Sequence, residues 1–94
     1  MLHIESLEID DHILDKIESK HRITFEEVEQ ACQADTWHIR RSKEGLYKLF
    51  SQTEGGRYIL VALVNLGKGN WKVATAREMT DSERRLYSKT MGGK

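Results

Sequence analysis

The feature that most constrains this chain is an almost unbroken apolar run, Tyr58 to Val64, with the length of one β-strand. A strand that is apolar at nearly every position is covered on both faces, whereas a half-exposed strand alternates between apolar and polar residues. Turn-forming segments that contain glycine flank the run at residues 53–56 and 67–70. The pattern therefore predicts a central strand between two turns.

Other segments around this run predict the remaining strands of the sheet. Apolar and polar residues alternate over residues 37–40 and 71–76, and residues 46–52 form a further strand. A turn at residues 42–45 separates the first of these from the second. A broken apolar alternation over residues 2–9 fits a short strand at the edge of the sheet.

One apolar stripe and two capping boxes predict three helices. After Asp10 or Asp11, apolar residues recur at helical spacing as far as Ile17, and this helix is expected to fray near residues 20–22. In a capping box, a threonine hydroxyl and a glutamate three residues later each accept a hydrogen bond from the other's backbone N–H. The two boxes in this sequence are Thr24 with Glu27 and Thr80 with Glu83. The last helix is expected to run to about residue 90.

This order of elements predicts an α+β fold in a single domain over residues 1–94. An N-terminal strand and two helices pack on a four-stranded antiparallel meander, and a C-terminal helix closes the domain. Helices on one face of the sheet leave the opposite face partly open for binding. We expect one shared core, formed by Ile13, Ile17, Phe25, Val28, Tyr58, Leu60 and Val64.

Charge is unevenly distributed along the chain although its net charge is zero. Residues 1–36 contain 10 acidic and 3 basic side chains, whereas residues 37–94 contain 5 acidic and 12 basic ones. This asymmetry fits one face for an anion and another for a basic partner. It also fits simple attraction between the two parts of the chain within the fold.

Several classes of protein are disfavoured by the sequence. No apolar run approaches the ~20 residues that cross a bilayer, and the acidic N-terminus lacks the apolar segment of a signal peptide. The single cysteine, Cys32, cannot form an internal disulfide, which favours a reducing, cytoplasmic setting. Cys32 lies on an apolar helix face and is expected to be a core residue. No metal-ligand spacing or phosphate-binding loop occurs, so neither a metal nor a cofactor is expected.

Basic side chains on the strands and their ends are the best candidates for chemistry. They could stabilise a bound phosphate, and His21, next to Lys20 at the end of the first helix, could transfer a proton near neutral pH. A histidine at this position also commonly caps a helix, and a basic strand face is commonly just solvated. Lys72 and Arg77 have opposite parity, so only one need face the open side unless a bulge intervenes. The strand cations are Arg40, Arg41, Lys48, Arg57, Lys72 and Arg77.

Three stretches of the chain resemble BrnT-type toxins. Residues 20–28 are similar to the family segment Lys-His-Gly-[Ile/Val]-Ser-Phe-Glu-Glu-Ala, and residues 56–62 to Gly-Arg-Leu-Leu-Val-Val-Val. Residues 72–80, followed by Glu83-Arg84-Arg85 and Tyr87, resemble the closing signature Arg-Ile-Ile-Ser-Ala-Arg-Lys-Ala-Thr…Glu-Arg…Tyr, the most specific of the three. Order and spacing agree over about residues 10–90.

The resemblance implies a RelE-like fold and a metal-independent endoribonuclease, the toxin of a type II toxin–antitoxin pair. It implies an RNA substrate and an antitoxin with a ribbon-helix-helix part. The expected assembly is a homodimer or a toxin–antitoxin heterotetramer. The positions that match the family's polar residues give the catalytic candidates His21, Arg57, Lys72 and Arg77. Lys20, Arg40, Lys48 and Tyr87 are the candidates for binding RNA or its phosphates. The antitoxin is expected to be acidic where it contacts the basic face.

The chain also departs from the family pattern. Arg22 replaces a glycine, Lys72 replaces an arginine, Glu78 replaces a basic residue, and Leu46 follows Glu44-Gly45 where an arginine often occurs. The last three changes weaken the positive potential of the expected RNA face, because lysine lacks the bidentate fork of arginine and glutamate reverses the charge. A second hypothesis is therefore a partner-binding module that has lost the chemistry, and a third is a structural domain without a ligand.

Overall fold

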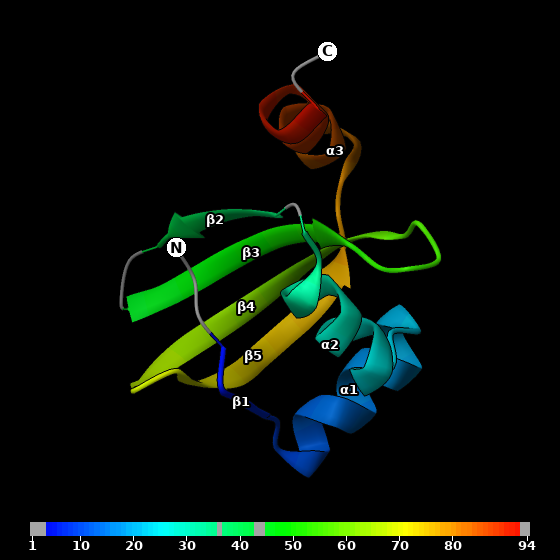
Figure 1. The fold of residues 1–94 in the computed structure, drawn as a ribbon. Helices are drawn as coiled ribbons and strands as arrows, with labels where there is room; N and C mark the ends of the chain where they lie inside the picture. The colour runs from blue at the N-terminus through cyan, green and yellow to red at the C-terminus, as the bar shows by residue number, and fades with distance from the viewer. Residues whose placement is uncertain (1–3, 36, 43–44, 93–94) are drawn as a thin grey trace.

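The computed structural model describes residues 4–35, 37–42 and 45–92, and for residues 91 and 92 the backbone only. A twisted sheet has α1 and α2 packed together on one face, and α3 stands apart from them beyond the end of β5 (Figure 1). The elements in chain order are β1 (Ser6–Glu8), α1 (Asp11–His21), α2 (Phe25–Gln33), β2 (Trp37–Arg41), β3 (Leu46–Gln52), β4 (Tyr58–Gly67), β5 (Asn70–Glu78), α3 (Asp81–Tyr87) and η2 (Ser88–Gly92).

The strand order is β1-β5-β4-β3-β2, which places the apolar run Tyr58–Val64 in the centre of the sheet. The predicted central strand and antiparallel meander are confirmed, because β2, β3, β4 and β5 each pair antiparallel with the next. The N-terminal edge strand is also confirmed, but it runs parallel to β5 and makes the sheet mixed. The α+β class predicted from the sequence is therefore correct.

The expected single core is wrong, because the two-residue period of β4 divides its side chains between two clusters. Ile59, Val61 and Leu63 point toward α1 and α2 and join the larger cluster. Leu60 points the other way and packs in a smaller cluster with Phe50, Met79 and Tyr87, against which Tyr58 is also packed. We call these two sides of the sheet the helix-pair face and the α3 face.

The helix boundaries follow the predicted capping signals. Both capping boxes are formed, Thr24 with Glu27 and Thr80 with Glu83. The first helix ends at His21, and Arg22 adopts the left-handed conformation with φ 55°. Glycine is favoured at this position beyond a helix end because it has no Cβ to clash. The backbone conformation at position 22 would therefore suit glycine better than the arginine of this chain.

A β-bulge in β5 changes which side chains share a face. The register passes from Ala62 opposite Thr75 to Leu63 opposite Val73, so one extra residue is inserted in β5. As a result, Lys72 lies opposite Val64 and Arg77 opposite Leu60, both on the α3 face. The bulge therefore brings to one face two residues that simple alternation would separate.

Parts of three sequence predictions fall outside the described residues. They are the start of the first strand at residue 2, the centre of the turn at residues 43 and 44, and the end of the tail at residues 93 and 94. Within the described residues, the C-terminal helical segment continues beyond residue 90, because η2 extends to Gly92.

Candidate functional site

Arg57 is held on the helix-pair face by two carboxylates and two carbonyls. Its guanidinium donates to both Glu27 oxygens, at 3.0 and 3.1 Å, and to Glu78 at 2.9 and 3.1 Å. It also donates to the carbonyl oxygens of Arg22 and His21 at 2.7 and 3.3 Å. Burial lowers the pKa of Arg57, but the bonds and charges of Glu78 and Glu27 outweigh this and raise it overall. Arg57 therefore joins the end of α1, the start of α2 and the end of β5.

Arg77 is held on the α3 face by the other capping box. Its guanidinium donates to both oxygens of Glu83, at 2.8 and 3.0 Å, and to the Glu78 carbonyl at 3.1 Å. Glu83 also accepts from the Thr80 N–H at 2.9 Å. Hydrogen bonds from Arg77, opposed in part by burial, lower the pKa of Glu83 to about 2. One carboxylate thus fills the donor fork that a phosphate would use.

The four catalytic candidates do not converge on one point. His21 and Arg57 meet on the helix-pair face, where the His21 carbonyl accepts a hydrogen bond from Arg57. Lys72 and Arg77 share the α3 face, but their partners on β4, Val64 and Leu60, are four residues and roughly 13 Å apart. The Lys72 ammonium pairs with Asp10 at 3.0 Å. Lys20 is exposed near the end of α1.

The strand register lines up polar groups across the α3 face. Arg40 lies opposite Lys48, which lies opposite Ala62, which in turn lies opposite Thr75. Arg40 and Lys48 are exposed, and neither forms an ion pair with a carboxylate of the described residues. They line a depression of about 350 Å³ between the sheet and α3, together with Arg41, Ser42, Phe50, Glu83 and Leu86.

Tyr87, one of the RNA-binding candidates, is buried with 5% of its surface exposed. Its ring meets Tyr58 edge-on, with the ring centroids 5.9 Å apart. The guanidinium of Arg84 lies over the same Tyr58 ring, 4.4 Å from its centroid. Tyr87 therefore supports a stack whose outer member is Arg84.

His38 is a candidate that the sequence reasoning missed. It lies opposite Phe50, which lies opposite Leu60, which lies opposite Arg77, so all four share one line across the α3 face. The imidazole is half-buried beside the Phe50 ring, 6.0 Å away between centroids. The sequence pattern could have identified it: His38 alternates with the apolar residues Trp37 and Ile39, so it lies on the same face of its strand as Arg40.

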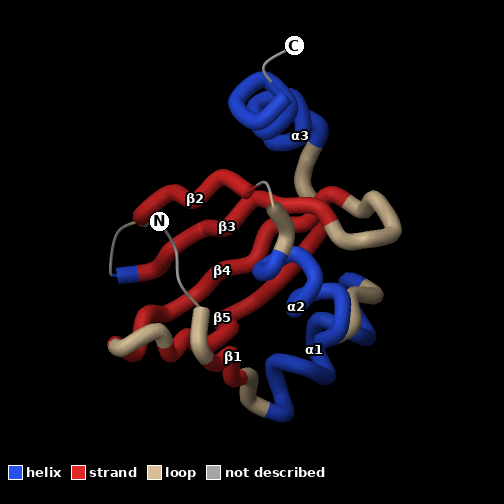
Figure 2. The backbone as a smooth tube through the Cα atoms, viewed as in Figure 1, coloured by secondary structure: helices blue, strands red, loops and turns tan. Residues whose placement is uncertain are grey.

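The opposite side of the molecule is acidic where α2 meets the turn between β3 and β4. A hollow there is lined by Glu26, Glu29, Asp35 and Glu54, with several uncharged residues. Figure 2 shows this region, with α1 and α2 in one group and α3 separate from them. The uneven charge of the sequence thus becomes an acidic helix pair on one side and exposed cations on the other.

Other kinds of site find little support in the described residues. Cys32 is buried in the larger core, and burial, aided by Glu29, raises the pKa of its thiol to about 12, so it is no nucleophile at neutral pH. No group of three or more metal-binding side chains occurs within residues 4–35, 37–42 and 45–92. The same residues include no helix with the length and apolarity of a membrane span.

The α3 face can therefore bind a polyanion. Exposed Arg40 and Lys48 present positive charge on this face, Lys72 and Arg77 are paired there with Asp10 and Glu83, and Thr75 adds a hydroxyl. Arginine and lysine bind phosphodiester oxygens by charge-assisted hydrogen bonds, and arginine does so with two parallel N–H groups. The helix-pair face offers no comparable surface, because α1 and α2 cover it.

Comparison with known proteins identifies the fold. No protein-family model and no curated protein matches the sequence. Among solved structures, the chain is similar to the crystal structure of BrnT, a ribonuclease toxin from Brucella abortus, with a TM-score of 0.68 and 15% sequence identity. The match covers 81% of this chain and 97% of the BrnT chain. The resemblance inferred from the sequence motifs is therefore confirmed at the level of the fold.

Proposed function

We propose that this chain is the toxin of a type II toxin–antitoxin pair, a metal-independent endoribonuclease that binds RNA across its α3 face. The observation that carries the proposal is the pair of exposed cations, Arg40 and Lys48, beside Thr75 on that face, with no ion pair to a carboxylate of the described residues. The fold of a ribonuclease toxin supports the assignment. We place the activity in the cytoplasm, where the RNA substrate and the antitoxin are made.

The proposed reaction is internal transesterification. The RNA 2′-hydroxyl attacks the adjacent phosphorus, the bond to the 5′-oxygen breaks, and a 2′,3′-cyclic phosphate and a 5′-hydroxyl remain. Arg77 would hold the phosphate and stabilise the charge that grows in the transition state. Lys72, Arg40 and Lys48 would hold the flanking phosphates. The requirement for a 2′-hydroxyl explains selection of RNA over DNA.

Proton transfer is assigned here to His38 rather than His21. His38 shares the α3 face with Arg77, but the two backbones are three strand spacings, roughly 14 Å, apart. Both side chains would therefore have to reach toward a phosphate held between them. His21 lies on the helix-pair face beside Arg57. An imidazole is well suited to transfer protons near neutral pH. In this assignment, Arg57 and His21 maintain the fold at the end of α1, and the family-like motif at residues 20–28 is structural.

Cleavage of a defined RNA by purified protein, with growth arrest on induction, tests the proposal. Arg77→Ala should lower the cleavage rate by about 10²–10³-fold without unfolding the domain. His38→Gln should lower it by about 10²–10⁴-fold, and His21→Gln is the matched control that should leave it unchanged. Full activity of Arg77→Ala contradicts the proposed site. Loss with His21→Gln but not His38→Gln moves the chemistry to the helix-pair face.

A partner-binding module without catalysis is the second candidate function. Carboxylates already occupy three of the four catalytic candidates: Arg57 with Glu27 and Glu78, Lys72 with Asp10, and Arg77 with Glu83. Tight binding of a ribbon-helix-helix antitoxin by a chain that cleaves no RNA would support this alternative. In either case, we expect an acidic antitoxin segment on the α3 face. Its association should slow as salt rises from ~50 to ~500 mM.

A further inference from the structure

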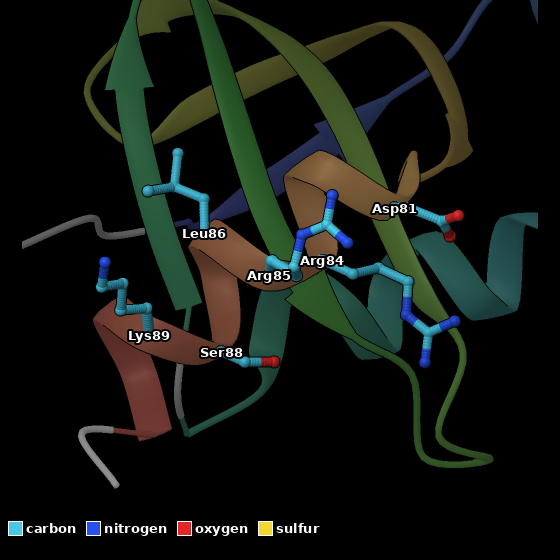
Figure 3. A pocket seen from close by; sticks show the side chains of 6 residues that line it. All are labelled: Asp81, Arg84, Arg85, Leu86, Ser88 and Lys89. Atoms are coloured by element: carbon cyan, nitrogen blue, oxygen red, sulfur yellow. The ribbon is translucent and has the colours of Figure 1, made fainter.

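The outer surface of α3 and η2 carries a second group of cations, which the proposed reaction does not use. Arg84 and Arg85 project from α3 and Lys89 from η2, as Figure 3 shows. With Ser88, Leu86 and a single acid, Asp81, they line an open depression of about 790 Å³. None of the three cations forms an ion pair with a carboxylate of the described residues.

Arg84 differs from its neighbours because a ring holds it in place. Its guanidinium lies 4.4 Å from the centroid of Tyr58, and Tyr58 rests edge-on against the buried Tyr87. The guanidinium thus lies over an aromatic ring, while Arg84 itself is exposed and lines the depression. Nucleobases stack on guanidinium planes as they do on aromatic rings.

Leu86 connects this surface to the α3 face. It is 44% exposed, one of two large hydrophobic side chains that are strongly exposed among the described residues. It lines both the depression with Arg84 and the one with Arg40 and Lys48. A strand of RNA on the α3 face can therefore pass over Leu86 and reach the outer side of α3.

We propose that the outer surface of α3 and η2 is a binding subsite for single-stranded RNA next to the cleavage site, in which a nucleobase stacks on the Arg84 guanidinium and Arg85 and Lys89 bind the neighbouring phosphates. This inference rests on the proposed function and extends it to the flanking nucleotides. A base, rather than an acidic peptide, fits the site because the guanidinium of Arg84 is itself planar, is exposed and lies over the Tyr58 ring. Arg85 and Lys89 supply the charge that a phosphate backbone requires.

Binding of a 2′-O-methyl RNA, which cannot be cleaved by its own 2′-hydroxyl, measures the subsite directly. Arg84→Lys keeps the charge and removes the plane, so it should weaken binding by about 5- to 100-fold, nearly as much as Arg84→Ala. The matched control is Arg85→Lys, which should change affinity little. Arg85→Ala should weaken binding and reduce by about one the slope of log affinity against log salt. Thermal unfolding of each variant checks that the fold is retained.

The same RNA with abasic positions separates stacking from charge. If a base stacks on Arg84, an abasic RNA should bind the unmodified protein and Arg84→Lys with equal affinity. If Arg84→Lys binds intact RNA with unchanged affinity, the proposed subsite is overturned. Weaker RNA binding by Arg40→Ala and Lys48→Ala would in that case still support RNA binding on the α3 face. If all these variants bind RNA normally, the proposed function itself fails. If Arg84→Lys weakens only binding of an acidic antitoxin segment, the surface belongs to the protein partner.

Discussion

Arg57 and Arg77 form the same local structure on opposite faces of the sheet, with different consequences. Each donates to the glutamate of a Thr-x-x-Glu capping box, Glu27 or Glu83. Arg57 also donates to a second carboxylate and to two carbonyls. All three nitrogens of its guanidinium therefore link separate segments of the chain. Arg77 has a single carboxylate, which a phosphate could replace. The comparison indicates that one arginine locks the fold and the other is available for a ligand.

The largest expected effect concerns the smaller core, which fixes α3 above Arg77. Leu60 is 5% exposed and packs with Phe50, Met79 and Tyr87. Leu60→Ala should lower the free energy of unfolding by about 2–5 kcal/mol, because it leaves a cavity. Urea unfolding measures this loss. If Leu60→Ala lowered the free energy of unfolding by less than an ordinary surface substitution does, the side chains on the α3 face would not be packed in solution.

The two arginines should differ in their effect on stability. Arg57→Ala should cost about 2–3 kcal/mol, because it leaves partly buried Glu27 and two carbonyls without their donor. Arg77→Ala should cost about 1 kcal/mol or less, since it leaves only one partly exposed carboxylate and one carbonyl without their donor. Urea unfolding of both variants under identical conditions gives the difference. Equal losses would contradict the division between a locking and an available arginine.

Acid should weaken the α3 face through Glu83. The pKa of its carboxyl is about 2 in the folded protein, against 4.5 as the ordinary value. The stabilisation from Glu83 is thus complete above pH 4.5 and is lost as the pH falls from there through 2. With allowance for solvent screening, it amounts to about 1–2 kcal/mol.

Glu83→Gln should therefore flatten the fall of stability between pH 4.5 and 2, measured by unfolding at a series of pH values. Glu18→Gln, at an exposed position of α1 outside the ion pairs described above, is the control and should keep the slope of the unmodified protein. A slope unchanged by Glu83→Gln would show that the Arg77–Glu83 pair is not formed in solution.

The smallest expected effect is at the end of α1, beside Arg57. Arg22 has a left-handed backbone conformation with φ 55°. Arg57 donates a hydrogen bond to the backbone carbonyl of Arg22, and a residue of any type at position 22 would supply this carbonyl. Arg22→Gly should raise the free energy of unfolding by about 0.5–1 kcal/mol, because glycine adopts this conformation without a Cβ clash. Thermal unfolding detects the gain. A loss of stability would mean that the Arg22 side chain contributes more than its backbone strain costs.

The fold could be predicted from the sequence because its signals are local. The apolar run gave the central strand, and the two Thr-x-x-Glu boxes gave the starts of α2 and α3. The division into two cores was missed, although the alternation of Ile59 and Leu60 already implies it. The parallel pairing of β1 with β5 joins residues more than 60 positions apart, which no local pattern reveals.

The candidate site was harder to predict because it depends on register. The bulge near Ala62 decides that Lys72 and Arg77 share a face, and sequence alternation alone cannot locate it. The partners of Arg57 are likewise distant in sequence, so its role as a link between α1, α2 and β5 was not visible. His38 could have been found, since its parity with Arg40 is local.

The central claim is that RNA binds the α3 face and not the helix-pair face. Backbone amide chemical shifts, followed by NMR during titration with a 2′-O-methyl RNA, test it most directly. We expect the largest changes at Arg40, Lys48, Thr75 and Arg77, with small changes in α1 and α2. The largest changes at His21, Arg22 and the start of α2 would contradict the account and place the RNA on the helix-pair face.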